Sequence, residues 1–207
     1  MLEYPSILGW RRCLEHLDEP CYAFNKYDGS NLRFEWAPKQ GWFKHGTRHQ
    51  LFDQNTPLYG PAVQIFNDRI GDGVVEQIRQ AYGKKVERIT AFCEFFGPNS
   101  FAGTHQEGDL MTLRLFDVSV FKKGFISPKE FSQLFNADWA AQLDYKGPLS
   151  QEFIDSVRNG QNELFEGVVC KGGESHGLWR TKVKSVAYLE RLKASYPSLY
   201  AEEKELG

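Results

Sequence analysis

The sequence predicts an α+β domain with antiparallel sheets and peripheral helices. Segments rich in aromatic and β-branched residues dominate the chain, and short amphipathic segments with serine caps lie between them. Hydrophobic residues make up 41% of the 207 residues and aromatic residues 14%, which is enough for a sizeable core. The length and the absence of repeats or low-complexity tracts predict one domain over residues 1–207.

Six segments have the composition of strands. Asn31–Trp36 alternates with a period of two, as expected for a half-buried strand. The longer strand Thr112–Phe121 is followed by a turn at Lys122-Lys123-Gly124. A glycine-rich turn around Gly172-Gly173 joins the last two predicted strands, Phe165–Cys170 and Leu178–Lys184. The predicted strands are Cys21–Asn25, Asn31–Trp36, Arg88–Phe96, Thr112–Phe121, Phe165–Cys170 and Leu178–Lys184.

Four segments are predicted to be helices, each with a recognisable start or stop signal. The first is Val74–Tyr82, with Val75, Ile78 and Tyr82 on one face and Gly83 just beyond its end. The others are Ser127–Phe135 with Pro128 at the first turn, a helix capped by Ser150 that buries Phe153, Ile154 and Val157 and ends at Gly160, and Ser185–Ala194, which stops near Pro197. Pro98–Asp109 is a long polar loop, either a substrate loop or plain surface.

Composition excludes several classes of protein. The net charge of −2 does not suit a protein that grips long duplex DNA unaided, so a polyanionic partner would have to meet a local patch. The sequence contains no run of eighteen apolar residues, so no membrane span is predicted. The four scattered cysteines form no C-x-x-C pair, which argues against zinc and favours a reduced, cytoplasmic compartment.

The most informative stretch is Lys26-Tyr27-Asp28-Gly29-Ser30-Asn31, which places a lysine between a strand and a glycine turn. A lysine can act as a nucleophile when burial or nearby cations lower its pKa from about 10.4. Lys182 and Lys184 are candidate cations, because alternate residues of a strand share a face. The four-residue K-x-D-G pattern alone is weak, since most such lysines are solvated turn residues.

The order of the motifs that follow makes the pattern specific. Arg48 lies in a basic loop, Glu94 in Phe92–Gly97, and Phe116-Asp117 in a later strand, before Glu166-Gly167-Val168-Val169 and Thr181-Lys182-Val183-Lys184. From about Tyr22 to Ser185, this ordered set resembles the covalent nucleotidyltransferase superfamily of polynucleotide ligases and mRNA capping enzymes. The resemblance implies an ATP-grasp-like adenylation domain.

The resemblance also implies a role for each residue. Lys26 would attack the α-phosphate of ATP and carry AMP covalently, with Mg²⁺ or Mn²⁺ as the divalent cation. Gly29 would allow the tight turn, Asp28 would either form a hydrogen bond within the turn or orient Lys26, and Tyr27 and Asn31 would complete the nucleotide-binding stretch. Lys182 and Lys184 would contact the α-phosphate, Glu166 the metal ion, Glu94 the ribose, Phe116 the purine ring, and Arg48 the ribose or a 5′-phosphate.

Two features favour a minimal ATP-dependent RNA ligase, similar to the RNA ligase 2 and RNA-editing ligase family. The Ser30-Asn31 ending resembles RNA ligases, and the 23 residues after Lys184 leave no room for an OB-fold domain. Such an enzyme would join 3′-hydroxyl and 5′-phosphate ends in RNA repair, and its compactness would suit a phage. A compact DNA ligase core, a capping-type guanylyltransferase and a fold that only binds nucleotides or strand ends remain alternatives.

Overall fold

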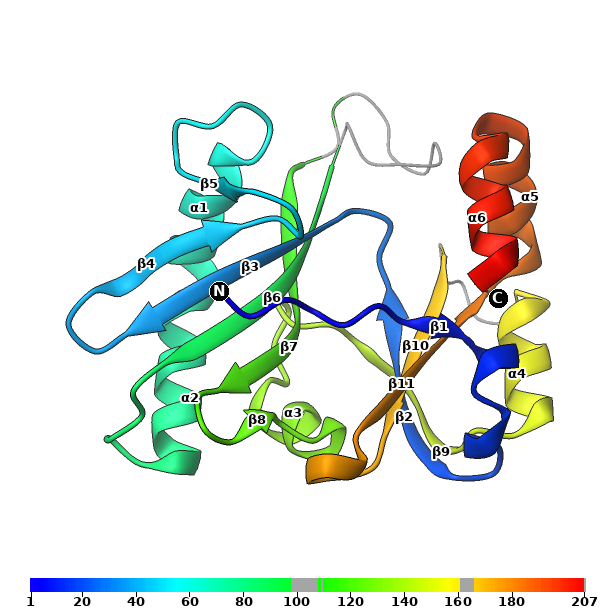
Figure 1. Cartoon of the computed structure of the whole chain (residues 1–207), viewed down its shortest axis with the longest axis horizontal. Coiled ribbons are helices and arrows are strands. Elements are labelled where there is room, and N and C mark those ends of the chain that lie inside the picture. The colour runs from blue at the N-terminus through cyan, green and yellow to red at the C-terminus, as the bar shows by residue number, and fades with distance from the viewer. Residues whose placement is uncertain (98–107, 109, 161–165, 207) are drawn as a thin grey trace.

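The structure is a computed structural model, and it describes residues 1–97, 108, 110–160 and 166–206. The described strands form two sheets that lie side by side (Figure 1). All their strand pairs are antiparallel except the short parallel pair of β1 with β11. The predicted α+β class with antiparallel sheets is therefore confirmed.

The six-stranded sheet has the order β5-β4-β3-β6-β7-β8, and the five-stranded sheet has the order β1-β11-β10-β2-β9. The strands of the first sheet are β3 (Ser30–Ala37), β4 (Gly41–Gly46), β5 (Leu51–Phe52), β6 (Ile89–Phe96), β7 (Thr112–Val120) and β8 (Gly124–Phe125). Those of the second are β1 (Leu8–Gly9), β2 (Pro20–Lys26), β9 (Leu143–Pro148), β10 (Gly167–Gly172) and β11 (Trp179–Lys184).

Helices pack against both sheets (Figure 1). The chain is helical from Gly60 to Tyr82 through a π-helical turn at Asn67–Gly71. No helix among the described residues is long and apolar enough to cross a membrane. The α-helices are α1 (Gly60–Phe66), α2 (Asp72–Tyr82), α3 (Pro128–Leu134), α4 (Gln151–Arg158), α5 (Val186–Ser195) and α6 (Pro197–Leu206).

The predicted caps Ser127 and Ser150 are confirmed, since each accepts a hydrogen bond from the backbone N–H three residues later, at 3.2 and 3.1 Å. Ser185 caps α5 in the same way, at 3.2 Å. The predicted end of the fourth helix near Pro197 is confirmed, because α5 ends at Ser195. A further helix that was not predicted, α6, begins at Pro197, since proline is tolerated in a first turn. The predicted inward face of α2 is confirmed as well: Ile78 is buried, Val75 and Tyr82 pack against the same core, and Val74 is buried beside them.

The boundaries of the predicted strands agree with the structure to within two residues where the structure describes them. Phe165 and nearly all of the predicted loop Pro98–Asp109 lie outside the described residues. Sequence analysis missed the short strands and β4, β9 and α1, because their apolar patterns are short or irregular.

The N-terminal segment Leu2–Gly9 joins the two sheets and runs between them in Figure 1. At its start, Arg33 of β3 donates a hydrogen bond from Nη1 to the Leu2 carbonyl at 2.9 Å. At its end, Leu8 and Gly9 pair with Thr181 and Lys182 of β11. We call Leu2–Gly9 the N-terminal strap.

The larger of the two main cores fills the space between the six-stranded sheet and α1, α2 and α3. Its centre is a stacked pair of rings, Phe34 of β3 and Phe66 of α1, with centroids 3.9 Å apart and planes inclined by 2°. Both side chains are fully buried, so this contact fixes α1 to the sheet. A second core lies between the five-stranded sheet and α4.

We expect Phe66→Ala to lower the free energy of unfolding by about 3–5 kcal/mol, because it leaves a cavity at a fully buried position. Urea denaturation followed by circular dichroism measures the change. Phe43→Ala is the matched control, since this exposed strand residue should cost no more than about 1 kcal/mol. Equal losses in the two variants would contradict the assignment of Phe66 to the core.

Candidate functional site

Lys26 is the last residue of β2, and Tyr27–Gly29 carry the chain from the five-stranded sheet to β3 of the six-stranded sheet. Gly29 is required here for a different reason from the predicted turn conformation, because its φ angle is not in the left-handed region. A Cβ atom at Gly29 would lie 2.4 Å from the Phe95 carbonyl oxygen. The glycine therefore permits close approach of this crossing to β6.

A cavity of about 310 Å³ lies beside this crossing. It brings together eight of the eleven residues that the sequence singled out, from positions 26 to 182 of the chain. These are Lys26, Tyr27, Gly29, Asn31, Arg48, Glu94, Phe116 and Lys182. The cavity is also lined by Tyr4, Pro5, Ser6, Ile7, Phe24, Asn25, Val169 and Lys171, and we call it the β10-side cavity, after the strand that supplies Val169 and Lys171.

Glu166 connects the nucleophile candidate to the last lysine of β11. Its Oε1 atom lies 2.8 Å from Lys26 Nζ and 2.7 Å from Lys184 Nζ, and its side chain is 3% exposed. Lys182 lies two residues before Lys184 and lines the cavity, as the alternation of β11 predicts. One buried carboxylate is thus shared by two ammonium groups at the edge of the cavity.

Two further predictions concern single residues. Phe116 lines the β10-side cavity together with Phe24, while Phe95 is in the core. Asp28 is buried and lines a separate groove on the other side of β2, so it does not face the β10-side cavity.

Glu94 carries a strongly shifted carboxyl group. The pKa of Glu94 is raised to about 8: burial is the main cause, the charge of Lys26 and the Gly29 N–H oppose it, and the negative charges of Glu166 and Asp28 add to it. At neutral pH the carboxyl therefore favours its neutral form. A neutral carboxyl can both donate and accept a hydrogen bond, which suits a ligand hydroxyl.

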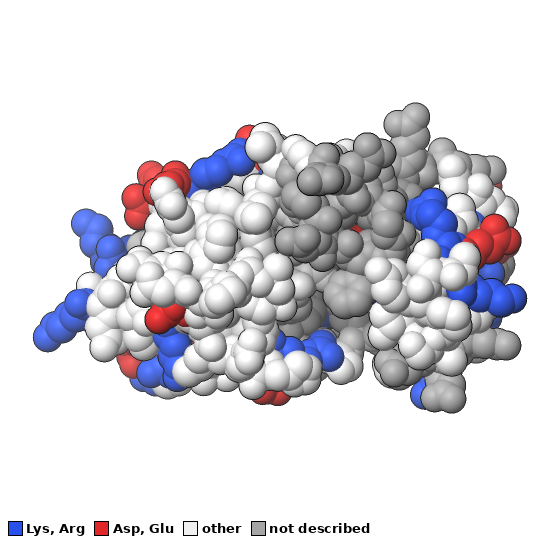
Figure 2. Space-filling model, turned by 90° about the horizontal axis from the view of Figure 1, so that it is seen from above, with Lys and Arg blue, Asp and Glu red and all other residues white. Residues whose placement is uncertain are grey.

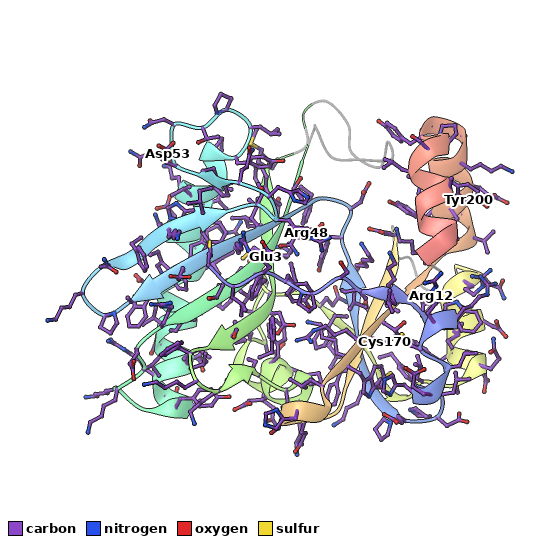
Figure 3. The ribbon with its side chains drawn as sticks, viewed as in Figure 1. Glu3, Arg12, Arg48, Asp53, Cys170 and Tyr200 are labelled. Atoms are coloured by element: carbon purple, nitrogen blue, oxygen red, sulfur yellow. The ribbon has the colours of Figure 1, made fainter. Side chains whose placement is uncertain are left out.

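Sequence analysis did not identify the N-terminal strap as part of the site. Tyr4 is buried, and its ring stands edge-on to Phe116 at 4.9 Å and 88°. Figure 3 labels Glu3 and Arg48, which both contact Arg33: Glu3 Oε1 lies 3.8 Å from Arg33 Nη1, and the Arg48 carbonyl accepts from Arg33 Nη2 at 3.4 Å. The strap has no sequence periodicity that could have revealed this position.

Asp117 joins the strap to both sheets. Its Oδ2 atom accepts hydrogen bonds from Tyr4 Oη at 2.9 Å, Lys171 Nζ at 3.0 Å and Arg180 Nη2 at 3.1 Å. Burial, and then the charge of Asp117, raises the pKa of Tyr4 well above its usual value. Burial lowers the pKa of Lys171, and Asp117 opposes that shift. Sequence analysis did not identify this cluster. The signal that could have revealed it is Lys171, a lysine within the otherwise apolar strand that contains Val168-Val169.

The donor atoms around Lys26 fit a hard divalent cation only in company with a ligand. Within the described residues no group of three or more His, Cys, Asp and Glu side chains could hold a metal ion. Glu166 and Glu94 provide carboxylates close enough to interact electrostatically, and Mg²⁺ is commonly held by one or two carboxylates plus phosphate oxygens and water. The residues present therefore fit a cation that arrives with a phosphate ligand.

The Glu94 pKa predicts a pH-dependent stability. The folded pKa of about 8 lies above the unfolded value of about 4.3, so the folded state binds the proton more tightly. Stability from this group is complete below about pH 4.3 and is lost as the pH rises to about 8. We expect the stability of Glu94→Gln relative to wild type to increase across this window by up to a few kcal/mol.

Urea midpoints measured at several pH values test this expectation. Glu87→Gln is the control, because it removes an exposed carboxylate in the same way without a buried partner. A difference between wild type and Glu94→Gln that stays constant from pH 5 to pH 8 would show that Glu94 has an ordinary pKa.

The Asp117 cluster predicts the effect of Tyr4→Phe. The variant keeps the ring against Phe116 but removes one hydrogen bond to a buried carboxylate, which typically costs about 1.5–3 kcal/mol. Tyr200→Phe, at a partly buried tyrosine whose hydroxyl makes no hydrogen bond with the described residues, should change stability by less than about 0.5 kcal/mol. Thermal or urea unfolding compares the stabilities of the two variants. If Tyr4→Phe is as stable as wild type, the hydrogen bond from Tyr4 to Asp117 does not stabilise the fold.

Comparison with known proteins supports the fold. No protein-family model matches the sequence, and no curated protein matches it. Among solved structures, a Naegleria gruberi RNA ligase with pyrophosphate is 15% identical with a TM-score of 0.68, over 94% of this chain and 58% of that one. An archaeal ATP-dependent RNA ligase is 18% identical with a TM-score of 0.67, over 99% of this chain and 56% of that one.

Two further structures extend the comparison. A mutant of the Naegleria gruberi RNA ligase, with ATP and Mn, has a TM-score of 0.68 at 16% identity, over 93% of this chain and 58% of that one. A protein from Aquifex aeolicus, provisionally described as an ATP-dependent DNA ligase, has a TM-score of 0.61 at 18% identity, over 99% of this chain and 57% of that one. This chain spans less than 60% of the length of these structures. At these identities the likeness shows a shared fold, and the structures compared are described as RNA ligases and, provisionally, a DNA ligase.

Proposed function

We propose that this chain is the adenylyltransferase unit of an ATP-dependent polynucleotide ligase that acts on RNA. One observation carries the proposal. Lys26 Nζ lies at the β10-side cavity, 2.8 Å from a buried carboxylate that also holds Lys184, and Lys182, Glu94 and Phe116 line the same cavity. A nucleophile, cations for a phosphate, a hydrogen-bonding carboxyl and an aromatic ring meet there.

In the first step, Lys26 Nζ loses a proton and attacks the α-phosphate of ATP. The new N–P bond forms as the bond to the β-phosphate oxygen breaks, and pyrophosphate leaves with that oxygen. Glu166 Oε1 is within hydrogen-bond distance to accept the proton. Lys182 and Lys184 neutralise negative charge that develops on the phosphoryl group, which is the main form of catalysis in such transfers.

The nucleotide would occupy the β10-side cavity with its purine against Phe116. Val169 of β10 also lines the cavity and offers an apolar contact to the base. Glu94 and Asn31 are cross-strand partners on the same wall, which suits hydrogen bonds to the ribose hydroxyls. Arg48 supplies a cation at the same cavity for the ribose or a 5′-phosphate, and a guanidinium can donate two parallel hydrogen bonds to phosphate.

The later steps transfer the AMP. A 5′-phosphate oxygen of the strand attacks the lysine-linked phosphorus, and Lys26 leaves as an amine and recovers a proton. A 3′-hydroxyl then attacks the 5′-phosphate, a phosphodiester forms and AMP leaves. Mg²⁺ or Mn²⁺, held by Glu166 and phosphate oxygens, would supply further charge neutralisation when bound. One of the neighbouring RNA ligase structures holds ATP and Mn.

We propose RNA rather than DNA as the substrate for two reasons. Two of the structural neighbours are described as RNA ligases, and Ser30-Asn31 follows the turn after Lys26. A compact DNA ligase is the second candidate, favoured by the likeness to the Aquifex aeolicus protein. Sealing assays with nicked RNA and nicked DNA decide between them.

Incubation with Mg²⁺ and ATP should increase the intact mass of the wild-type protein by one AMP, and Lys26→Ala should lose this gain entirely. Lys39→Ala removes an exposed lysine from the β3–β4 hairpin and should keep it. Protein that is already adenylylated shows the heavier mass at the start, and adding pyrophosphate then lowers it.

Three results would count against the proposal. A gain from GTP alone indicates capping chemistry instead. Equal labelling of Lys26→Ala places the nucleophile elsewhere. No adduct before or after incubation, with ATP binding retained, indicates a binding protein.

A further inference from the structure

A second and larger groove lies on the other side of β2. The five-stranded sheet has β10 on one side of β2 and β9 on the other. The β10-side cavity takes Val169 and Lys171 from β10, whereas the second groove takes Leu143 and Lys146 from β9. Both are lined by Phe24, Asn25 and Tyr27, so the end of β2 that carries Lys26 separates them. We call the second one the β9-side groove.

The β9-side groove is much the larger of the two. Its volume is about 890 Å³, against about 310 Å³ for the β10-side cavity. If the smaller one suits a single nucleotide, the larger has room for several. None of the residues assigned to catalysis or metal binding above faces it.

Three cations from three different elements line the β9-side groove: Arg114 of β7, Lys129 of α3 and Lys146 of β9. Among the described residues none of them lies within ion-pair distance of a carboxylate. The two carboxylates of the groove are compensated differently. Asp138 pairs with Arg69 at 3.2 Å, and Asp28 is buried with partners inside the protein.

The groove is therefore a locally positive surface on a chain whose net charge is −2. In the view from above, by contrast, the visible lysines and arginines lie in small separate groups beside carboxylates (Figure 2). A local group of cations that form no ion pair with the described carboxylates is what a polyanion requires when the whole molecule does not attract it.

Aromatic rings and amides complete the lining. Tyr27 and Phe96 form a parallel stack on one wall, with centroids 5.2 Å apart and planes inclined by 4°. Asn25 Oδ1 is buried and accepts no hydrogen bond from the described residues. Gln133, Asn136 and Gln142 add donors and acceptors. Cations that track a backbone beside aromatic rings are the features by which proteins hold single-stranded nucleic acids.

We propose that the β9-side groove binds a single-stranded segment of the RNA substrate, with phosphates at Arg114, Lys129 and Lys146 and bases against the aromatic wall. The inference rests on the proposed ligase function for the identity of the strand. It places the strand and the nucleotide on opposite sides of the β2 end that bears Lys26.

Binding of a short, end-labelled, single-stranded RNA with a 5′-hydroxyl, followed by fluorescence anisotropy at several salt concentrations, tests the proposal. Such an RNA cannot accept AMP at its 5′ end, so binding is measured without reaction. We expect the double variant Lys129→Ala/Lys146→Ala to lose about tenfold or more in affinity. The slope of log affinity against log salt should fall by about 1.4, the value for two phosphate contacts on a single strand.

Two control variants isolate the groove. Lys84→Ala/Lys85→Ala changes the net charge equally at exposed positions between α2 and β6, and should bind RNA within about twofold of wild type. Lys129→Arg/Lys146→Arg keeps the charge and should keep the affinity. The Lys129→Ala/Lys146→Ala variant should still gain the mass of AMP from ATP, which also shows that it is folded.

The outcomes separate this inference from the proposed function. If RNA affinity is unchanged in Lys129→Ala/Lys146→Ala, or falls equally in Lys84→Ala/Lys85→Ala, the β9-side groove is not the RNA site, whereas the proposed adenylylation of Lys26 is unaffected. If RNA binding depends on Lys129 and Lys146 but the protein never acquires AMP, the groove binds RNA and the proposed ligase function is wrong.

Discussion

The arrangement of the two sheets depends on one buried carboxylate, Asp117. It belongs to β7 of the six-stranded sheet, and its Oδ2 atom accepts from Lys171 and Arg180 of the five-stranded sheet and from Tyr4 of the N-terminal strap. A buried carboxylate without partners would be very costly, so these donors are held as a group. Because Phe116 precedes Asp117 and Lys171 also donates to the Phe116 carbonyl, the same cluster sets one wall of the β10-side cavity.

A second shared carboxylate, Glu166, organises the charges around the nucleophile. Its Oε1 atom serves Lys26 and Lys184 at the same time, so the two ammonium groups are held near one another despite their repulsion. Under the proposed function, the phosphate of the nucleotide would take over part of this neutralising role from Glu166. The cations would then already lie where phosphoryl transfer requires them, and little reorganisation would be needed at the moment of reaction.

The fold and most of the site residues were predictable because their signals are local. Alternation identified β3, serine caps identified two helices, and the order of short motifs selected most of the residues that line the β10-side cavity. The strap was not predictable, since Tyr4 and Asp117 are 113 residues apart and the segment around Tyr4 has no periodicity. Asp28 and Gly29 show another limit: a motif predicts which residues matter, but the direction of a side chain and the approach of Phe95 depend on tertiary packing.

The crossing from β2 to β3 links these features into one arrangement. It is held close to β6 at Gly29, it carries Lys26 at the β10-side cavity, and its Tyr27 and Asn25 line both that cavity and the β9-side groove. A ligand in the cavity and a ligand in the groove would therefore both lie against Asn25 and Tyr27. Because packed interiors deform little, a strand bound in the β9-side groove would restrain the position of Lys26 through these shared residues. Positioning of this kind is the main contribution a protein can make to phosphoryl transfer, where the reacting groups supply the chemistry themselves.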